Sequence, residues 1–236
     1  MNKQTVDIYA KTRIYGKNEG IIADGKNEFI KRYAEGKRVL HVGCSDWPIT
    51  QSRIDSHELL HGELSDHASY LMGIDLSEDG IDCMKRHGFE NIYVMDAEKM
   101  SINEKFDIII AGDVVEHLSN PGSFLKGVCK HLDHGGSCVI TVPSSFCLSH
   151  TLRYWFCGNE VVHKDHCCYF SPKTLAALCD RFDLLPTAIR YISGRPRTFP
   201  TLRCALRAWL LYNTLPHFLM IFRRREEVES DTYYEI

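Results

Sequence analysis

The chain has 236 residues, of which 44% are hydrophobic and 25% are charged, and its formal net charge at neutral pH is -3. This composition is that of one globular domain, with or without a sizeable appendage, and it excludes disordered, collagen-like and low-complexity chains. Because 28 lysines and arginines stand against 31 aspartates and glutamates, a global positive field for nucleic acid is missing, and we expect no nucleic-acid partner.

The N-terminus and the ten cysteines indicate a reducing compartment. Residues 1–17 contain no apolar run of the kind that forms a secretory signal peptide. The cysteines lack the paired CxxC spacing of a zinc ribbon, and several lie within apolar patterns, where a thiol behaves as a small buried hydrophobe. The apolar, uncharged stretch 208–222 is too short to span a membrane comfortably. We therefore expect a cytoplasmic protein with no transmembrane helix.

An N-terminal helical segment is expected over residues 1–35, and β-rich runs then alternate with segments of helical period from residue 38 to residue 142. That alternation is typical of a parallel sheet covered by helices. The five expected strands are 38–42, 70–74, 92–95, 106–110 and 137–142. The fold class is therefore α/β, with a Rossmann-like three-layer α/β/α sandwich and a mostly parallel sheet in a domain over residues 36–192.

Three helices of this domain carry clear start signals. Each begins after a residue whose side chain can cap a helix, namely Ser77, Asn120 and Ser171. Proline follows the second and third of these caps, and proline is favoured at the first helical position. Segment 144–170 follows the last of these strands and precedes the helix after Ser171, and it is expected to be lid-like.

The sequence changes character near its C-terminus. Residues 184–225 hold eight arginines and no lysine, aspartate or glutamate, whereas residues 226–236 carry five acidic residues. Further strands are expected after Phe182, but residues 193–236 read as an arginine-rich, α-helical appendage with an acidic tail. The apolar face of this appendage is compatible with packing on the domain, with peripheral membrane contact through 201–225, or with a homodimer contact.

Residues suited to a nucleoside ligand follow the expected strands. Gly43 lies in the turn after the first strand, where a glycine permits close approach of backbone to ligand. The turn continues with Ser45 and Pro48, so it lacks the GxGxxG pattern that binds a pyrophosphate. Asp75 ends the second strand, where a carboxylate can accept both hydroxyls of a ribose. A ribose without a pyrophosphate is the implied ligand.

This succession of motifs resembles the class I S-adenosylmethionine-dependent methyltransferases over about residues 36–185. The resemblance implies that S-adenosylmethionine is the cofactor and that a methyl group is transferred to an acceptor. It further implies that the turn after the first strand faces the methionine moiety, the second strand end the ribose and the third the adenine. The residues that the resemblance assigns to the cofactor are His41, Gly43, Cys44, Ser45, Asp75, Leu76, Asp96, Ala97, Gly112 and Asp113.

Two residues depart from the pattern of that family. His41 stands where the family usually has an acidic residue, and Ser45 stands where it usually has a second glycine. The imidazole of His41 can contact the cofactor through water or be a satisfied histidine at a strand end. Asp96 can likewise be the carboxylate of an Asx-type turn. The altered loop leaves open a cofactor-binding but inactive partner module, whereas an NAD-dependent enzyme would need the missing pyrophosphate site.

Three histidines are candidate catalytic residues. His117 follows the fourth strand in a Glu-His pair of the kind that the family resemblance shows there, while His163 and His166 lie in the expected lid. Imidazole is a natural base for a hydroxyl proton at neutral pH, although His117 can instead cap or pack beside the helix after Asn120. The HxDH pattern could bind a metal, but the sequence fixes no third ligand, and we predict no metal site.

Residues 116–144 and 163–175 resemble bacterial methyltransferases of surface polysaccharide and lipid-linked glycan synthesis. We therefore expect O-methylation of a sugar hydroxyl in a nucleotide-linked, lipid-linked or surface glycan. The arginine-rich segment fits such an acceptor, because arginine recognises phosphate and an apolar face can lie on a bilayer. A quinone or another prenylated small molecule fits equally well, and a membrane-peripheral adaptor is a further alternative.

Overall fold

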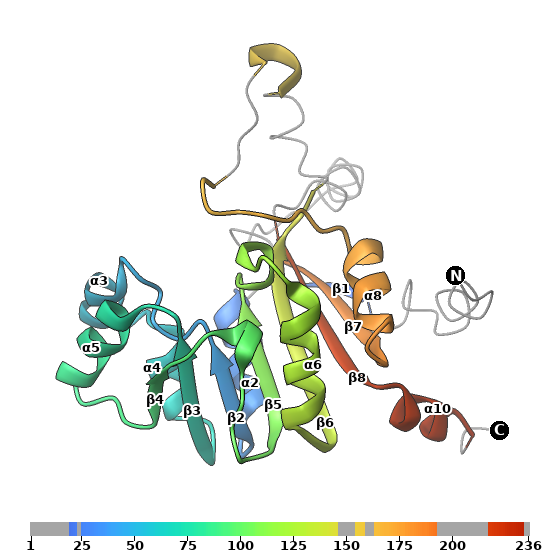
Figure 1. The fold of residues 1–236 in the computed structure, drawn as a ribbon, viewed down its shortest axis with the longest axis horizontal. Coiled ribbons are helices and arrows are strands. Elements are labelled where there is room, and N and C mark those ends of the chain that lie inside the picture. The colour runs from blue at the N-terminus through green and yellow to red at the C-terminus, as the bar shows by residue number, and fades with distance from the viewer. Residues whose placement is uncertain (1–18, 23–24, 146–153, 159–162, 193–216, 234–236) are drawn as a thin grey trace, which may run out of the picture.

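The computed structural model describes residues 19–22, 25–145, 154–158, 163–192 and 217–233 (Figure 1). The strands are β1 (Glu19–Ile22), β2 (Arg38–Val42), β3 (Tyr70–Asp75), β4 (Ile92–Val94), β5 (Phe106–Gly112), β6 (Leu132–Pro143), β7 (Leu184–Ile192) and β8 (His217–Arg224). The helices are α2 (Lys26–Ala34), α3 (Thr50–Asp55), α4 (Leu60–Ser65), α5 (Glu78–Arg86), α6 (Pro121–His131), α8 (Pro172–Asp180) and α10 (Arg225–Tyr233), with the short 3-10 helices η1 (Ala97–Lys99) and η2 (Val115–His117).

The eight described strands form one sheet in the order β1-β7-β8-β6-β5-β2-β3-β4. All neighbouring pairs are parallel except those of β8, which runs antiparallel to both β6 and β7. From β2 the chain adds β3 and β4 on one side and then returns to place β5 on the other side. The order therefore reverses between β2 and β5, and ligands of open α/β sheets bind at the carboxyl ends of strands at such a point.

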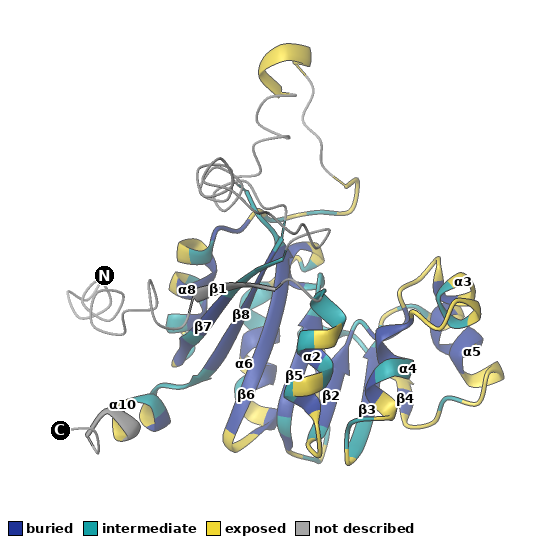
Figure 2. Ribbon diagram, turned by 180° about the vertical axis from the view of Figure 1, so that it is seen from behind, coloured by how far each residue is buried: buried dark blue, intermediate teal, exposed yellow. Residues whose placement is uncertain are grey.

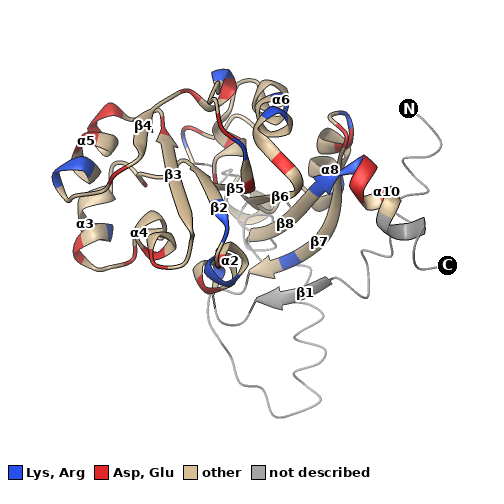
Figure 3. Cartoon of the chain, turned by 90° about the horizontal axis from the view of Figure 1, so that it is seen from below, with Lys and Arg blue, Asp and Glu red and all other residues tan. Residues whose placement is uncertain are grey.

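Helices cover both faces of the sheet, which is buried between them (Figure 2). Figure 3 shows α2 and α4 on one side and α6 and α8 on the other. On the side of α6 and α8, side chains such as Phe106, Phe124 and Leu175 form the largest hydrophobic cluster. On the side of α2 and α4, the core contains Ile30 and Leu64 among others. The predicted three-layer α/β/α class is thus confirmed.

The helix starts follow the capping signals in the sequence. The Ser77 hydroxyl accepts a hydrogen bond from the backbone of Gly80, and the side chain of Asn120 accepts one from Ser123. Ser171 forms a capping box with Thr174. Because these bonds satisfy backbone donors that a helix leaves unpaired, the three predicted starts are confirmed. The five predicted strands are confirmed as β2 to β6.

The prediction for the two ends of the chain was wrong in part. Residues 1–35 are not helical throughout, because Glu19–Ile22 form β1, which pairs with β7. Residues 217–224 are not helical either, since they form β8 inside the sheet. The run 218–222 is buried on both faces, and a fully buried strand shows no alternation that distinguishes it from a buried helix. Residues 193–216 of the predicted appendage lie outside the described residues.

The arginines at the end of β8 bind the domain itself. The Arg224 guanidinium donates to the backbone oxygens of Cys129 and Leu132, at 2.9 and 2.5 Å. Arg225 pairs with Asp180 at 2.5 Å and with Asp183 at 3.2 Å. These two arginines therefore fasten the last strand and α10 to the domain. The stretch 201–216, which carries most of the predicted apolar face, lies outside the described residues, so its packing, membrane and homodimer alternatives stay predictions. In the described part of the chain, no helix has the length and apolar character needed to cross a bilayer.

Candidate functional site

The candidate site lies where β2, β3 and β5 end, at the point where the strand order reverses. Gly43 makes the sharp turn after β2 with a φ of 74°. A Cβ atom at this position would lie 2.5 Å from Cγ2 of Val114, so the loops after β2 and β5 can approach each other only with a glycine here. The backbone N–H groups of Gly43 and Cys44 both donate to the carbonyl of Ile74, at 2.8 and 3.3 Å.

Asp75 ends β3 and fastens this turn. One carboxylate oxygen accepts hydrogen bonds from the backbone N–H and the hydroxyl of Ser45, at 2.9 and 2.8 Å. The other oxygen accepts one from the backbone of Ser77 at 2.9 Å. A carboxylate offers about four lone-pair positions, so these three bonds leave capacity for a ligand hydroxyl. Asp75 is half-buried, and the next side chain, Leu76, is 72% exposed beside it.

Three of the predicted cofactor residues are buried behind the turn that follows β2. His41, Cys44 and Ser45 are buried, at 3%, 0% and 0% exposure. The backbone donors of Cys44 and Ser45 are bonded to Ile74 and Asp75, as described above. The side chains of these three residues therefore pack behind the loop, and their predicted contact with the cofactor stays a prediction. The side chain of Ser45 packs against Gly80. A Cβ atom added to Gly80 would lie 2.4 Å from the Ser45 hydroxyl oxygen, so the glycine at position 80 makes room for the serine.

His41 forms a buried pair with His61 from α4. The Nδ1 atoms of the two imidazoles lie 3.3 Å apart, and the rings are stacked with an interplanar angle of 11°. Burial, reinforced by the neighbouring ring, lowers the pKa of His41 well below its usual value, and burial lowers the pKa of His61 to about 4. Both rings are therefore neutral at neutral pH. This is the satisfied histidine considered for His41.

Lys26 was missed in the sequence analysis. Its ammonium, at the first residue of α2, lies 2.6 Å from a carboxylate oxygen of Asp113, in the loop after β5. The other oxygen of Asp113 accepts a hydrogen bond from the Thr141 hydroxyl at 2.9 Å. Burial alone would raise the pKa of Asp113, but the Lys26 ammonium and the Thr141 hydroxyl outweigh it and hold that pKa below its usual value. This edge of the sheet thus contains an adjacent cation and anion.

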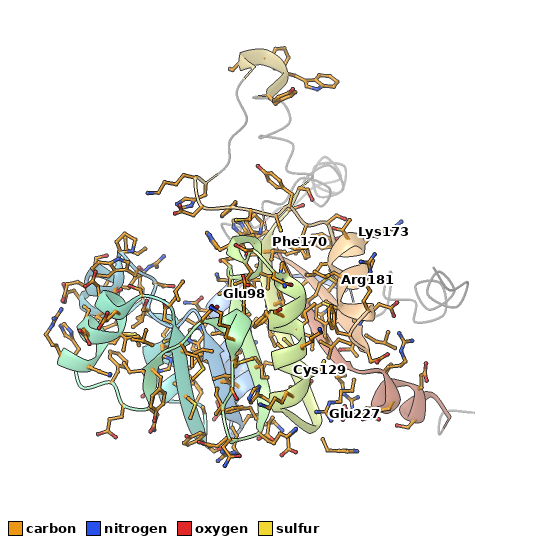
Figure 4. The ribbon with its side chains drawn as sticks, viewed as in Figure 1. Glu98, Cys129, Phe170, Lys173, Arg181 and Glu227 are labelled. Atoms are coloured by element: carbon orange, nitrogen blue, oxygen red, sulfur yellow. The ribbon has the colours of Figure 1, made fainter. Side chains whose placement is uncertain are left out.

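The third strand end carries Asp96 and Ala97, both half-buried. One oxygen of Asp96 accepts a hydrogen bond from the backbone of Glu98 at 2.9 Å, so Asp96 caps η1 in the manner of the Asx-type alternative. Glu98 in turn accepts from the backbone of Asn120 at 2.9 Å, and Figure 4 labels it beside α6. Gly112, at the end of β5, is half-buried. In the sheet, β2 and β3 lie between β5 and β4, the strand that precedes the turn of Asp96.

The three candidate catalytic histidines come together. His117 lies in η2 directly after β5, and residues 163–170 run above this edge of the sheet in Figure 1. The ring centroid of His117 is 4.6 Å from that of His166 and 5.9 Å from that of His163, and the latter two are 5.4 Å apart. Burial, together with the two neighbouring imidazoles, lowers the pKa of His166.

Backbone contacts hold this histidine cluster at the crevice. The N–H groups of Cys167 and Cys168 both donate to the carbonyl of Glu116, at 2.8 and 3.1 Å. At the base of the predicted lid, Ser144 and Phe170 form a β-bridge. Residues 146–153 and 159–162 of that lid lie outside the described residues.

Glu116 is a buried carboxyl group beside the cluster. It is 1% exposed, and among the described residues neither carboxyl oxygen has a hydrogen-bond partner. Burial raises its pKa to about 8, so the group is largely protonated at neutral pH. The Glu-His pair noted in the sequence therefore splits into a buried acid and an exposed imidazole.

These residues form two adjoining groups at one edge of the sheet. The first group offers a free carboxylate position at Asp75, an exposed apolar surface at Leu76 and the charge pair of Lys26 and Asp113. Such a set fits a nucleoside that carries an amino-acid moiety, because the ribose diol needs an acceptor and a zwitterion needs both charges. The second group offers imidazoles, which can accept a proton or bind a metal ion.

Comparison with known proteins is consistent with this geometry. Residues 15–188 match the model of a family described as "Methyltransferase domain". An enzyme named ubiquinone biosynthesis O-methyltransferase from Dechloromonas aromatica is 25% identical over 181 residues, which cover 69% of this chain and 71% of that enzyme. The enzyme of the same name from Idiomarina loihiensis is 23% identical over 155 residues, which cover 61% of this chain and 56% of the relative's length.

Solved structures share the fold. An N-methyltransferase from Bradyrhizobium japonicum in complex with S-adenosyl-L-homocysteine superposes with a TM-score of 0.53 and 17% identity, covering 84% of this chain and 83% of that one. A SAM-dependent methyltransferase from Archaeoglobus fulgidus superposes with a TM-score of 0.55 and 17% identity, covering 94% and 100% of the two chains.

Proposed function

Since the chain belongs to the methyltransferase domain family, we propose that it is an S-adenosylmethionine-dependent O-methyltransferase whose acceptor is an acidic, phenol-type hydroxyl on a quinone-like, prenylated molecule. The observation that carries this proposal is the cluster of His117, His163 and His166 beside the strand ends that suit the cofactor. A hydroxyl acceptor must lose a proton, and imidazoles are the groups that assist this at neutral pH.

The cofactor would be held by the first group of residues. Asp75 would accept the ribose hydroxyls, and Leu76 would cover one side of the nucleoside. The Lys26 ammonium and the Asp113 carboxylate match the carboxylate and the ammonium of the methionine moiety, one charge each. When bound, S-adenosylmethionine supplies a methyl group that its sulfonium already activates. The protein then has to align an acceptor oxygen, exclude water and assist loss of the hydroxyl proton.

An acidic acceptor makes the smallest demand on the histidine cluster. Burial and the two neighbouring imidazoles lower the pKa of His166, and an acidic hydroxyl needs the least help from a base. A phenol, with a pKa of about 10, meets this requirement far better than a hydroxyl with an acidity near that of water, whose pKa is about 15.7. The relatives from Dechloromonas and Idiomarina carry the name ubiquinone biosynthesis O-methyltransferase, which supports the same class of acceptor.

The comparisons favour the quinone-like alternative over the expected sugar hydroxyl. The relatives reported above are not named for sugar methylation. Of the arginines that favoured a phosphate-bearing glycan, Arg224 and Arg225 fasten β8 to the domain. Arg190 lies over the ring of Phe29 and Arg223 pairs with Glu227. The other four lie outside the described residues. A sugar acceptor therefore belongs in the test as a competing outcome.

The test is methyl transfer from isotope-labelled S-adenosylmethionine by the purified full chain. A prenylated phenol, the same phenol without its prenyl chain, a nucleotide sugar and a lipid-linked glycan serve as acceptors. The proposal predicts labelled product with the phenols and a lower KM for the prenylated one. Product with the sugars alone would overturn the acceptor class. Cofactor binding without transfer to any of the four would instead favour the inactive partner module.

A further inference from the structure

We propose that His117, His163 and His166 form a binding site for a divalent transition-metal ion of the zinc class. Each imidazole has a ring nitrogen that can act as a ligand, and these three atoms lie within 4.8 Å of one another. The prediction of no metal site rested on the lack of a third ligand beside the HxDH pattern. The fold supplies that ligand by bringing His117, from the end of β5, against the segment that carries the other two.

The geometry needs only small side-chain rotations to close on an ion. Zinc binds imidazole nitrogen at about 2.0–2.1 Å in a tetrahedral arrangement, which places the ligand nitrogens roughly 3.4 Å apart. The three rings must therefore approach by about an ångström or somewhat more from their present separation of up to 4.8 Å. His117 and His163 are exposed and His166 is half-buried, so their rings have room to turn.

One ligand is already oriented by the kind of contact that supports metal-binding histidines. The Nδ1 atom of His117 lies 3.1 Å from the backbone oxygen of Asp165. Since a carbonyl oxygen only accepts hydrogen bonds, Nδ1 carries the proton and Nε2 keeps its lone pair for an ion. A hydrogen bond from the second ring nitrogen to a backbone carbonyl is the usual partner of a metal-bound imidazole.

The backbone also fixes the distance between the two segments. The donors of Cys167 and Cys168 bind the carbonyl of Glu116, which directly precedes His117. The backbone N–H of His166 donates to the carbonyl of His163 at 3.0 Å, and the centroids of the two rings lie 5.4 Å apart. Three imidazoles without a ligating carboxylate suit zinc, cobalt or nickel, whereas magnesium and calcium prefer oxygen ligands.

A site with three protein ligands leaves one tetrahedral position open. Resting on the proposed function, we assign that position to the acceptor hydroxyl. A metal ion lowers the pKa of a bound hydroxyl, as it does that of bound water, so the proton can pass to solvent at neutral pH. When an ion is bound, the ion that the imidazoles hold, rather than a free imidazole, would assist loss of the hydroxyl proton.

The test measures metal binding in the absence of cofactor and acceptor. Zn²⁺ is titrated into the metal-stripped full chain by calorimetry, and Co²⁺ is used in parallel because its visible absorption reports a tetrahedral nitrogen site. The variants are His117→Ala, His163→Ala and His166→Ala. The matched controls are His134→Ala, whose side chain is 88% exposed away from the cluster, and Cys167→Ser, which removes an exposed thiol.

The proposal predicts one tight equivalent of Zn²⁺ in the wild type and a rise of at least about 10-fold in Kd in each cluster variant. Both controls should bind as the wild type does, and S-adenosylmethionine should bind equally well to all six proteins. Zn²⁺ binding that is unchanged in the cluster variants, or weakened to the same extent in His134→Ala, would overturn the site. Circular dichroism of each variant separates loss of the site from loss of the fold.

Activity measurements distinguish the failure of this inference from that of the proposed function. If the wild type binds Zn²⁺ through the cluster but methylates no phenol, the metal site stands and the acceptor assignment fails. If phenol methylation survives removal of all metal by a chelator, the acceptor assignment stands and the role of the ion fails. Restoration of lost activity by Zn²⁺ or Co²⁺, with a fall in the KM of the acceptor, supports both.

Discussion

The two halves of the candidate site are built in different ways. In the cofactor half, formed by Gly43, Asp75 and the residues around them, the backbone donors are bonded within the protein and the supporting side chains are buried. In the histidine half, formed by His117, His163 and His166, the rings are largely exposed and come from two segments more than forty residues apart. The first half is therefore complete before a ligand arrives, whereas the second has freedom to adjust around an acceptor or an ion.

The difference shows that residues of the cofactor half serve both folding and binding, whereas those of the histidine half serve binding alone. A change in the cofactor half disturbs the packing of β2, β3 and β5 together with the ligand contacts. The reason is that Asp75 both fixes the loop after β2 by hydrogen bonds and offers an acceptor to the ligand. A change in the histidine half removes side chains of the lid segment and η2, whereas the backbone bonds that hold these segments together remain. Variants of the two halves should thus separate turnover from cofactor affinity and from stability.

The largest effect is expected from His166→Ala. Loss of an assisting group from the acceptor side should lower kcat by about 100-fold or more, because proton transfer contributes about 10²–10⁴ to such reactions. The affinity for S-adenosylmethionine and the melting temperature should stay close to those of the wild type. Steady-state kinetics and calorimetry check the split. A matched loss of cofactor affinity would break the separation of the two halves.

The next largest effect is expected from Asp75→Asn. The amide keeps the shape of the carboxylate but cannot accept the ribose hydroxyls and the Ser45 donors at once, and hydrogen bonds to a charged group contribute about 1.5–3 kcal/mol. S-adenosylmethionine should bind about 10- to 100-fold more weakly. Asp79→Asn, on the exposed surface of α5, is the control. Equal affinities in the two variants would remove Asp75 from the cofactor site.

The cofactor half should also be the more sensitive to acid. The folded protein keeps His61 neutral with a pKa of about 4, against an ordinary value of 6.5. The unfolded chain therefore binds more protons between these values, and stability present above pH 6.5 falls as the pH drops toward 4, by about 3 kcal/mol for this group. Melting temperatures of the wild type, His61→Leu and the control His134→Leu give the comparison.

His61→Leu should show a shallower loss of stability with acid than the wild type, while His134→Leu should follow the wild type. Only the slopes with pH are compared, so a uniform offset caused by the new packing of leucine does not matter. Parallel curves for all three proteins would show that the pair of His41 and His61 is not what acid disrupts.

The smallest effect concerns the turn after β2. Alanine at Gly43 must adopt a left-handed conformation, which costs about 1–2 kcal/mol before any contact with Val114 is counted. Gly112→Ala, whose added Cβ would meet its nearest atom, the Thr141 hydroxyl oxygen, at 3.7 Å, should be nearly neutral. Chemical denaturation of both variants checks this order. A Gly43→Ala protein as stable as the wild type would show that the loops after β2 and β5 can move apart without a cost in stability.

Much of this architecture could be predicted from the sequence because its signals are local. Alternating apolar runs gave β2 to β6, and caps such as Ser171 with Thr174 marked helix starts, since each depends on residues within a few positions. Further strands after Phe182 were expected, but the residues of β8 were assigned to the helical appendage because a strand buried on both faces has no alternation. Lys26 was missed because its contact with Asp113 joins residues 87 positions apart, and no local pattern encodes that contact.

The site residues divide in the same way. Asp75 lies at the crevice as expected, because a strand end fixes its position. The motif could not predict whether His41, Cys44 and Ser45 point toward the ligand or into the core. That direction depends on which side chains from other segments fill the space behind the loop. That His117 would meet His163 and His166 follows only from the backbone bonds to Glu116, which are tertiary contacts.

The central claim is that the edge formed by β2, β3 and β5 binds S-adenosylmethionine, and calorimetric titration of the wild-type chain tests it most directly. The account predicts saturable one-to-one binding of S-adenosylmethionine and S-adenosylhomocysteine and none of NADH. The reason is that the backbone donors of the Gly43 turn are bonded within the protein and cannot cradle a pyrophosphate. Binding of NADH in preference to the two sulfur nucleosides, or binding of none of the three, would contradict it.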